Sequence, residues 1–327
     1  MKLKLEMFED FHVHGASAPE WNQRYLQISA GAMRSSLAEV TTDSIHVFRK
    51  WMSERVVRQG CLPGGKICFA LPVCKLVETP RMQGREVDED GVFILRSGEE
   101  FTLQRPQGLE LLAATLELDD FRRLLDQRPG APNALALLSR SVLRGPGGAV
   151  QRLRRTLLSS FDRPWAAEPF EVDAAPASGV AFEVLAQLFD GAANPRQTLG
   201  SASASYIVAP CHRIVAESGD APPSISPLCL RLRTSRRTLL ESFRQVADAT
   251  PVHYLRSVRL NAVRRRLMAT RPSDLDVAQA AGDRGFSHLS HFAERYKTLF
   301  GELPSQTARS DGGHGAIDGA AGGPRRS

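Results

Sequence analysis

The stretch SDLDVAQAAGDRGFSHLSHFAERYKTLF, residues 273–300, decides the fold of the C-terminal part of this chain. Ser273 can cap a helix, with Asp276 three residues later as its capping-box partner. A Gly-Asp-Arg-Gly-Phe segment then breaks the helix, and Ser287 can cap a second one that runs to Phe300. Two short helices, the second with an apolar side and a polar, basic side, predict a helix-turn-helix unit.

The same design occurs about 52 residues earlier in the chain. Ser226 and Pro227 can open a short helix that runs through Leu232, since proline suits the first helical position. Ser235 can cap a second helix that ends at about Val246. The sequence therefore predicts two helix-turn-helix units.

One longer helix is expected between the two units. Thr250 can cap it, Pro251 takes its first position, and it runs to about Met268. Its apolar residues form two stripes on different sides, so it can pack against a unit on each side. One stripe contains Leu255, Val258 and Ala262, and the other contains Leu260, Val263 and Leu267.

The positive charge of the chain is concentrated in this C-terminal part. The whole chain has a net charge of +6, whereas residues 226–310 alone contain 14 Arg and one Lys against seven acidic residues. Arginine suits bidentate contacts with phosphates and bases, so a basic region of this kind favours a nucleic-acid partner.

The N-terminal part has the pattern of a β domain. Between residues 24 and 118, short alternating runs such as Ile67, Phe69 and Leu71 are separated by glycine-containing breaks. Helical patterns follow from 119 to 190, among them ALALLSRSVL and VQRLRRTLLSSF. We therefore predict an α+β multidomain fold, with a β-barrel or jelly-roll-like sensing domain and flanking helices before the all-α domain.

Composition and spacing divide the chain into four segments. We expect a sensing and dimerisation domain at 1–190, a linker at 191–204, a DNA-binding domain at 205–309 and a disordered tail at 310–327, which is rich in Gly, Ala and Ser. No apolar run is long enough for a transmembrane helix, and the first residues lack the apolar core of a signal peptide. The five cysteines form no CxxC pair, which is typical of reduced thiols in the cytoplasm.

Three stretches of the C-terminal part closely resemble the AraC family of bacterial transcription regulators. They are SRRTLLESF at 235–243, TPVHYLRSVRLNAVRRRL at 250–267 and VAQAAGDRGFSHLSHFAERYKTLFGELPSQT at 277–307. The resemblance covers roughly residues 205–309. Within the family, the sequence HLSHFAERYKTLFGELPS is most similar to the subgroup that includes the ethanolamine-operon regulator. WNQRYLQISAGAMRSSLAEV at 21–40 is a weaker match to the sensing half of that subgroup.

The resemblance implies that each unit places its second helix in the major groove of double-stranded promoter DNA. By position, the base-contact candidates are Arg236, Arg237, Leu240 and Glu241 in the first unit and His288, Leu289, Ser290 and Glu294 in the second. Leu289 could instead belong to the core. The phosphate-contact candidates are Ser235, Arg244, Arg259, Arg264, Arg265, Ser287, His291, Arg295 and Lys297.

The sequence departs from the family pattern at three positions. Arg233 stands where the turn of the first unit normally carries glycine, so a positive φ there would be strained. Arg284 replaces a large apolar residue before Gly285, and Gly282 weakens the helix that precedes the second turn. We therefore expect the first unit to be less stable or less specific in its base readout.

Two other motifs compete with this interpretation. Pro210-Cys211-His212-Arg213 resembles the active-site motif of DNA alkylguanine alkyltransferases, in which an activated cysteine accepts an alkyl group. The alternative is that Cys211 is a core residue in the first helix of the DNA-binding domain. His12 and His14 resemble a metal-binding pair, but no partner ligands stand out, and we interpret them as a surface pair.

Together these observations predict a cytoplasmic, non-enzymatic transcription factor with no cofactor and no metal site. The family resemblance implies a small-molecule effector bound by the N-terminal domain, a homodimer, contact with RNA polymerase and no membrane association. Activators are common in the family. The sequence does not assign the effector-binding residues.

Overall fold

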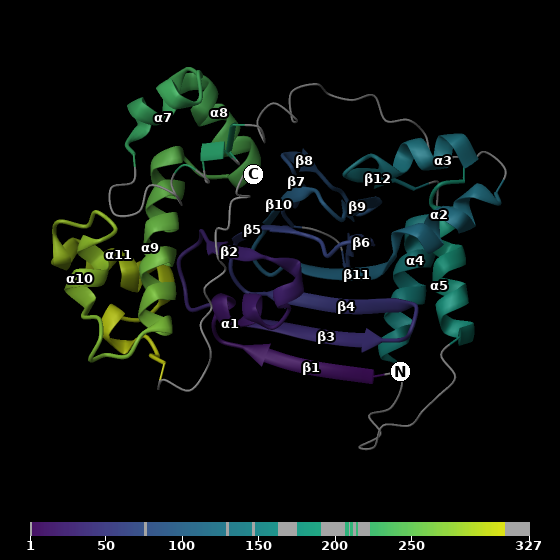
Figure 1. Cartoon of the computed structure of the whole chain (residues 1–327), viewed down its shortest axis with the longest axis horizontal. Coiled ribbons are helices and arrows are strands. Elements are labelled where there is room, and N and C mark those ends of the chain that lie inside the picture. The colour runs from purple at the N-terminus through teal and green to yellow at the C-terminus, as the bar shows by residue number, and fades with distance from the viewer. Residues whose placement is uncertain are drawn as a thin grey trace, which may run out of the picture.

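The structure, a computed structural model, describes residues 2–74, 77–128, 131–145, 148–162, 175–190, 207–208, 210–211, 214 and 223–310. The segments predicted as a linker at 191–204 and as a tail lie outside these residues, apart from Ser310. A β-rich N-terminal part is followed by an all-helical C-terminal part, as the sequence predicts (Figure 1).

Two antiparallel sheets form the N-terminal part. The seven-stranded sheet has the order β1 (Lys2–Phe8), β3 (Ser35–Thr41), β4 (Ile45–Met52), β11 (Glu110–Glu117), β6 (Lys66–Pro72), β9 (Gly91–Arg96) and β12 (Val142–Arg144). The five-stranded sheet has the order β2 (Arg24–Gln27), β5 (Val56–Cys61), β10 (Glu100–Arg105), β7 (Arg81–Met82) and β8 (Arg85–Glu86). The described strands thus form a jelly-roll-like sandwich of two open sheets and not a closed barrel.

Alternation along each central strand separates two cores. On β6, for example, Phe69 faces a cluster shared with the flanking helices, whereas Cys68 and Ala70 face the other sheet. The short helix α1 (Phe11–Ala16) and the 3₁₀ turn η1 (Pro19–Trp21) connect β1 with β2.

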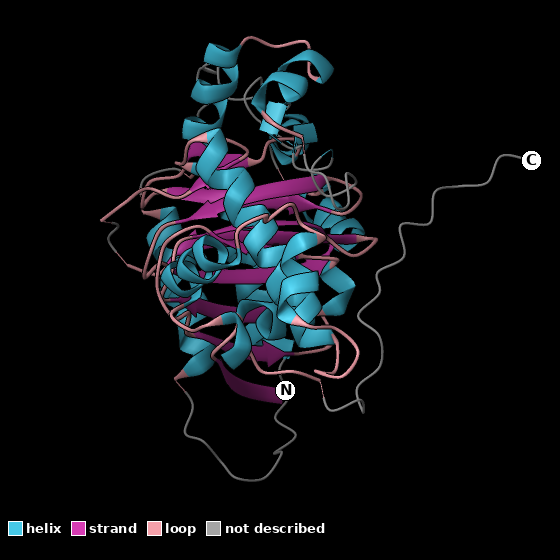
Figure 2. Ribbon diagram, turned by 90° about the vertical axis from the view of Figure 1, so that its left-hand side faces the viewer, coloured by secondary structure: helices cyan, strands magenta, loops and turns pink. Residues whose placement is uncertain are grey.

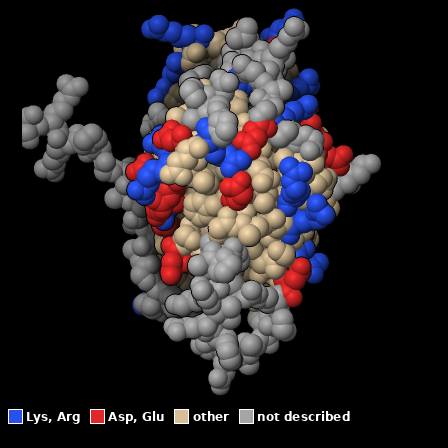
Figure 3. Space-filling model, turned by 90° about the vertical axis from the view of Figure 1, so that its right-hand side faces the viewer, with Lys and Arg blue, Asp and Glu red and all other residues tan. Residues whose placement is uncertain are grey.

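Helices cover the outer face of the seven-stranded sheet. The rings of Phe69, Phe121 and Phe189 meet edge to face at centroid distances of 5.1 to 6.1 Å. The covering elements are α2 (Leu118–Asp126), α3 (Ala131–Leu138), α4 (Ala149–Leu158), η2 (Ser159–Phe161) and α5 (Ala175–Gln187). On this side of the molecule, charges of both signs are mixed with neutral side chains (Figure 3).

The predicted helix ALALLSRSVL is only partly correct. Helix α3 ends at Leu138, and Val142–Arg144 form the edge strand β12 against β9. The Arg96 guanidinium donates to the carbonyls of Leu138 and Arg140, both at 2.7 Å, and so satisfies the end of the helix. Leu143 is completely buried in the strand that follows.

The C-terminal part contains the two predicted helix-turn-helix units joined by a long helix. The first unit consists of α7 (Ile225–Arg231) and α8 (Arg236–Ala247), the connecting helix is α9 (Pro251–Ala269), and the second unit consists of α10 (Val277–Gly282) and α11 (Leu289–Phe300), followed by η3 (Pro304–Gln306). Both stripes of α9 are buried as predicted, except for the half-buried Ala262. Leu255 and Val258 pack in the core of the first unit, and Leu260, Val263 and Leu267 pack in that of the second.

Two predicted caps are confirmed. Ser235 Oγ accepts from the Thr238 amide at 3.0 Å, and Thr250 Oγ1 accepts from the His253 amide at 3.2 Å. These contacts fix where α8 and α9 begin.

The other predicted helix starts are wrong by one to three residues. Asp276, and not Ser273, caps α10 by accepting from the Gln279 amide at 2.6 Å. Helix α11 begins at Leu289 with His288 at its N-cap position, so Ser287 is not its cap. The Phe286 ring just before it packs against the Phe292 ring. Helix α7 begins at Ile225, with Ser224 at the N-cap position.

The C-terminal helices pack directly on the sandwich, which the sequence does not predict. Helix α9 lies beside β2, and Figure 2 shows the C-terminal helices in front of the strands. Asn261 pairs with the backbone of Gln27 through two hydrogen bonds of 3.2 Å, and the Gln27 side chain donates to the Leu299 carbonyl at 2.6 Å. Gly301, at φ 78°, approaches Ala32 so closely that a Cβ would lie 3.0 Å from the Ala32 amide nitrogen.

Candidate DNA interface

Helix α8 presents a polar surface over a fully buried apolar one. Leu239 and Phe243 are completely buried beneath it, whereas Arg236, Arg237 and Glu241 are exposed. Arg237 Nε donates to Glu241 Oε1 at 2.9 Å, with the two side chains 87% and 61% exposed. An ion pair this exposed contributes little to stability, so both groups can exchange it for contacts with bases. The fourth candidate on this helix, Leu240, is half-buried.

The turn of the first unit contains the strain that the sequence predicts. Arg233 has φ 50°, in the left-handed region. The turn is held by its backbone, because the Arg233 amide donates to the Leu230 carbonyl at 3.2 Å and the Thr234 amide to the Cys229 carbonyl at 3.0 Å. In the second unit Gly285 takes the corresponding left-handed position at φ 75°. The first turn therefore keeps its shape at a cost of about 1–2 kcal/mol.

Arg233→Gly is expected to raise the free energy of unfolding by about 1 kcal/mol, because glycine adopts a positive φ without strain. Chemical denaturation monitored by circular dichroism measures the change. Arg244→Gly is the matched control, since Arg244 is an exposed arginine inside α8 and should lower the same quantity by about 1 kcal/mol. Equal destabilisation by both variants would contradict the assignment of strain to the turn.

Helix α11 has the same two-sided design in the second unit. Phe292 and Tyr296 are buried, whereas His288, Ser290 and Glu294 are exposed. Leu289 is 47% exposed, so of its two interpretations the structure favours the surface position over the core. An exposed apolar side chain at the start of such a helix suits the methyl group of thymine.

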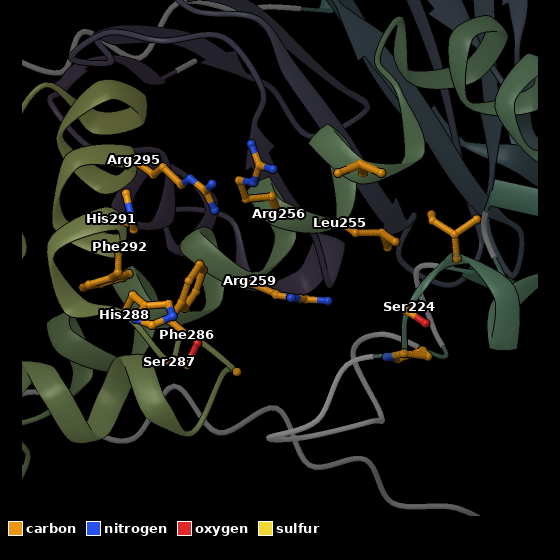
Figure 4. A pocket seen from close by; sticks show the side chains of 14 residues that line it. Ser224, Leu255, Arg256, Arg259, Phe286, Ser287, His288, His291, Phe292 and Arg295 are labelled. Carbon is orange, nitrogen blue, oxygen red and sulfur yellow. The ribbon is translucent and has the colours of Figure 1, made fainter.

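A positively charged groove of about 350 Å³ crosses α9 between the two units (Figure 4). Arg256, Arg259 and Arg295 line it, together with His288 and His291. Burial and the neighbouring Arg295 lower the pKa of Arg256, and burial and Arg256 lower that of Arg259. Cations that disfavour one another in this way are stabilised by an anion.

Arg256 is the residue of this groove that the sequence analysis missed. It lies three residues before Arg259 on α9, so both side chains are on the same side of the helix. This three-residue spacing from Arg259, which is already a phosphate-contact candidate, could have identified Arg256 from the sequence.

Most of the other predicted phosphate contacts lie at the surface. The exposed ones are Ser235, Arg244, Arg265, Ser287, His291, Arg295 and Lys297, and Arg259 is half-buried.

The prediction for Arg264 is wrong. Its side chain is 10% exposed, donates from Nε to Asp10 Oδ2 at 2.6 Å and from Nη1 to Glu302 Oε1 at 2.7 Å, and stacks on Phe300. Burial lowers its pKa, but Asp10, with smaller contributions from Tyr296 and Glu302, outweighs burial and the net shift is upward. Since α9 turns this side toward the sandwich, Arg264 joins the two parts of the chain.

The neighbours of Cys211 that the structure describes disfavour its thiolate. Cys211 is completely buried in the core of the first unit, with Val208, Leu228 and Phe243. Burial raises the pKa of the thiol to about 12, so the thiolate that alkyl transfer requires is disfavoured. His212 lies outside the described residues.

The prediction of a surface histidine pair is wrong for His14. This side chain is completely buried, and its Nδ1 lies 2.6 Å from Ser35 Oγ. His12 is half-buried. Within the described ranges, no group of three or more His, Cys, Asp or Glu side chains is placed to hold a metal ion.

Comparison with known proteins places this helical region in a family. A family model described as a helix-turn-helix domain matches residues 228–310. Residues 228–310 are an AraC-type helix-turn-helix domain. The resemblance to the AraC family that the sequence motifs indicate is thereby confirmed.

Curated relatives match over part of the chain. XylDLEGF operon transcriptional activator 1 of Pseudomonas putida is 41% identical over 75 residues, which is 23% of this chain and 23% of that protein. The probable thc operon regulatory protein of Rhodococcus erythropolis is 29% identical over 89 residues, 27% of each chain. The matched segment thus spans about a quarter of the length of these relatives.

Over a longer range the chain is similar in structure to ToxT from Vibrio cholerae. That similarity covers 93% of this chain and 96% of ToxT, with a TM-score of 0.31 and 12% identity. None of the helices that the structure describes is long and apolar enough to cross a membrane.

Proposed function

We propose that this protein is a sequence-specific transcription regulator whose AraC-type domain reads promoter DNA with both helix-turn-helix units. The observation that carries the proposal is the pair of exposed polar surfaces on α8 and α11 with a cationic groove between them. Arg236, Arg237, Leu240 and Glu241 would read one major groove, and His288, Leu289, Ser290 and Glu294 the next. The arginines that line the groove across α9 would hold the phosphates between them.

The N-terminal sandwich would act as the sensor of the regulator. An effector bound there would alter the contact between β2 and α9, and thereby the orientation of the two units. The helices that cover the seven-stranded sheet would contribute to a homodimer. The protein would act in the cytoplasm, as an activator that contacts RNA polymerase, in keeping with the activators among its relatives.

Binding to the DNA upstream of the protein's own gene tests this function. We expect binding that survives an excess of unrelated competitor DNA across a series of salt concentrations. Binding that disappears with competitor and falls steeply with salt would be non-specific attraction to phosphates, and would contradict sequence-specific recognition.

Cys211→Ser distinguishes a regulator from an alkyl acceptor. The variant is expected to bind the same DNA with unchanged affinity, because Cys211 lies in the core and away from the exposed surfaces of α8 and α11. Incubation with DNA that contains O6-methylguanine, followed by mass spectrometry of the protein, should show no transferred methyl group in the unsubstituted chain. Methyl transfer that the substitution abolishes would support the alkyltransferase instead.

A further inference from the structure

Three cationic side chains are buried between the two sheets of the sandwich. Lys50 projects from β4 of the seven-stranded sheet, and Arg58 and Arg105 project from β5 and β10 of the five-stranded sheet. Their exposed fractions are 4%, 4% and 0%. The space between the sheets of a sandwich is normally filled by apolar side chains, and lysine and arginine are almost never fully buried unless they are paired.

Tyr25 on β2 lies at the centre of this cationic cluster. Lys50 Nζ donates to the Tyr25 hydroxyl at 3.0 Å, and the Arg58 guanidinium is 5.8 Å from the Tyr25 ring. Arg105 Nη2 donates to the backbone carbonyls of Lys50 at 3.0 Å and of Leu109 at 2.9 Å. All three cations therefore act electrostatically on a single phenol.

Within the residues that the structure describes, none of the three cations forms an ion pair, although Glu110 acts on Arg105 from a distance. Arg105 Nε and Nη1 and Arg58 Nε are buried without a hydrogen-bond partner, as is Nε2 of the adjacent His14. Arg264, which is also buried, pairs with two carboxylates. Burial, which Tyr25 offsets in part and Arg58 reinforces, lowers the pKa of Lys50 to about 8 and that of Arg105 to about 10. Unsatisfied donors and unbalanced charge of this kind disfavour the unliganded state.

We propose that the cluster of Lys50, Arg58 and Arg105 is the effector site and that the effector is a compact organic carboxylate. This inference rests on the proposed function, because it identifies the ligand class of the sensor. A carboxylate supplies the missing negative charge and can accept from several of the unpaired N–H groups. Because all three cations are buried, we propose a small ligand.

Aromatic rings next to the cluster suit an apolar or aromatic body on the ligand. The Arg58 guanidinium lies 4.7 Å from the Trp21 ring and 5.0 Å from the Phe101 ring. Lys50 Nζ lies 5.8 Å from the Phe48 ring. If the cations move toward the carboxylate of a ligand, these ring faces become free to pack against the apolar part of the same ligand.

The site is also connected to the AraC-type domain by direct packing. Tyr25 belongs to the same buried cluster as Val263 and Tyr296 of the C-terminal helices. On β5, Val56 and Val57 immediately precede Arg58 and pack against the two units, Val56 with the second and Val57 with the first. A ligand that moves Tyr25 or Arg58 therefore acts on side chains that support both DNA-reading units.

Calorimetric titration of the full chain, without DNA, tests this assignment. The probes are benzoate, acetate, inorganic phosphate and the neutral analogue benzamide. We expect benzoate or acetate to bind with a Kd of about 1 mM or tighter and to raise the melting temperature, and benzamide to do neither. Because no DNA is present, a negative result leaves the DNA-binding function untouched.

Lys50→Met is the decisive variant, since methionine keeps the unbranched chain and removes the charge. It should weaken carboxylate binding at least about tenfold while the melting temperature of the unliganded protein stays the same or rises. Arg58→Met serves the same purpose if the first variant does not fold. Lys66→Met is the control, because Lys66 on β6 is paired with Glu117 at the surface.

Three results would overturn the proposal. The first is that benzamide binds as tightly as benzoate. The second is that Lys50→Met and Arg58→Met leave carboxylate binding unchanged. The third is that neither benzoate nor acetate binds. In the last case, a response to phosphate alone would assign the cluster to an inorganic ion.

Discussion

Arg237→Ala is expected to weaken binding to the specific operator about tenfold to a hundredfold, which corresponds to the loss of one bidentate base contact of about 1–3 kcal/mol. The side chain is 87% exposed, and its one described ion pair is with the exposed Glu241. The substitution should therefore leave the free energy of unfolding almost unchanged. Fluorescence anisotropy with operator DNA and with a scrambled duplex measures both affinities.

The comparison between the two duplexes decides the role of Arg237. Loss on the operator alone indicates base readout, whereas equal loss on both duplexes would reduce Arg237 to a phosphate contact. Arg122→Ala is the matched control, because Arg122 is an exposed arginine of α2 on the covered sheet of the sandwich. It should change neither affinity.

Arg264→Met is expected to lower the free energy of unfolding by about 3–5 kcal/mol, the usual cost of removing one partner from a buried ion pair. Asp10 has an exposed side-chain fraction of 10%, and Glu302 one of 32%, so the substitution leaves two carboxylates close together at the contact between the sandwich and the AraC-type domain. Denaturant titration measures the loss, and separate probes on the two parts would show whether they then unfold independently.

Arg266→Met, two residues further along α9, provides the control for that variant. Arg266 pairs with Asp283, but its side chain is 34% exposed. An ion pair this accessible to water contributes about 0–1 kcal/mol. Equal losses in the two variants would contradict the view that Arg264 joins the two parts of the chain.

The sequence predicts the elements of the AraC-type domain because its signals are local. Ser235 and Thr250 cap the helices that follow them, and the two apolar stripes of α9 are visible in a single helical period. The strain at Arg233 can be predicted because the turn requires a residue in the left-handed conformation, and this position carries arginine in place of glycine. Each of these features depends on residues within a few positions of one another.

The parts that could not be predicted depend on partners far away in the chain. Arg264 follows the pattern of a solvated helix side, and it is a buried ion pair because of Asp10, 254 residues earlier, and Glu302, 38 residues later. His14 is buried because Ser35 and the sandwich cover it. Residues 142–144 form a strand because β9 offers an open edge. Periodicity shows which face of an element is apolar, but not what covers the other face.

The central claim is that one chain reads two adjacent major grooves with its two units. Hydroxyl-radical footprinting of the operator with the full chain tests this most directly. The account predicts two protected segments on one face of the duplex, separated by about one helical turn of 10–10.5 base pairs, with Arg237→Ala relieving one segment and Glu294→Ala the other. A single protected segment, or two that respond together to either substitution, would contradict it.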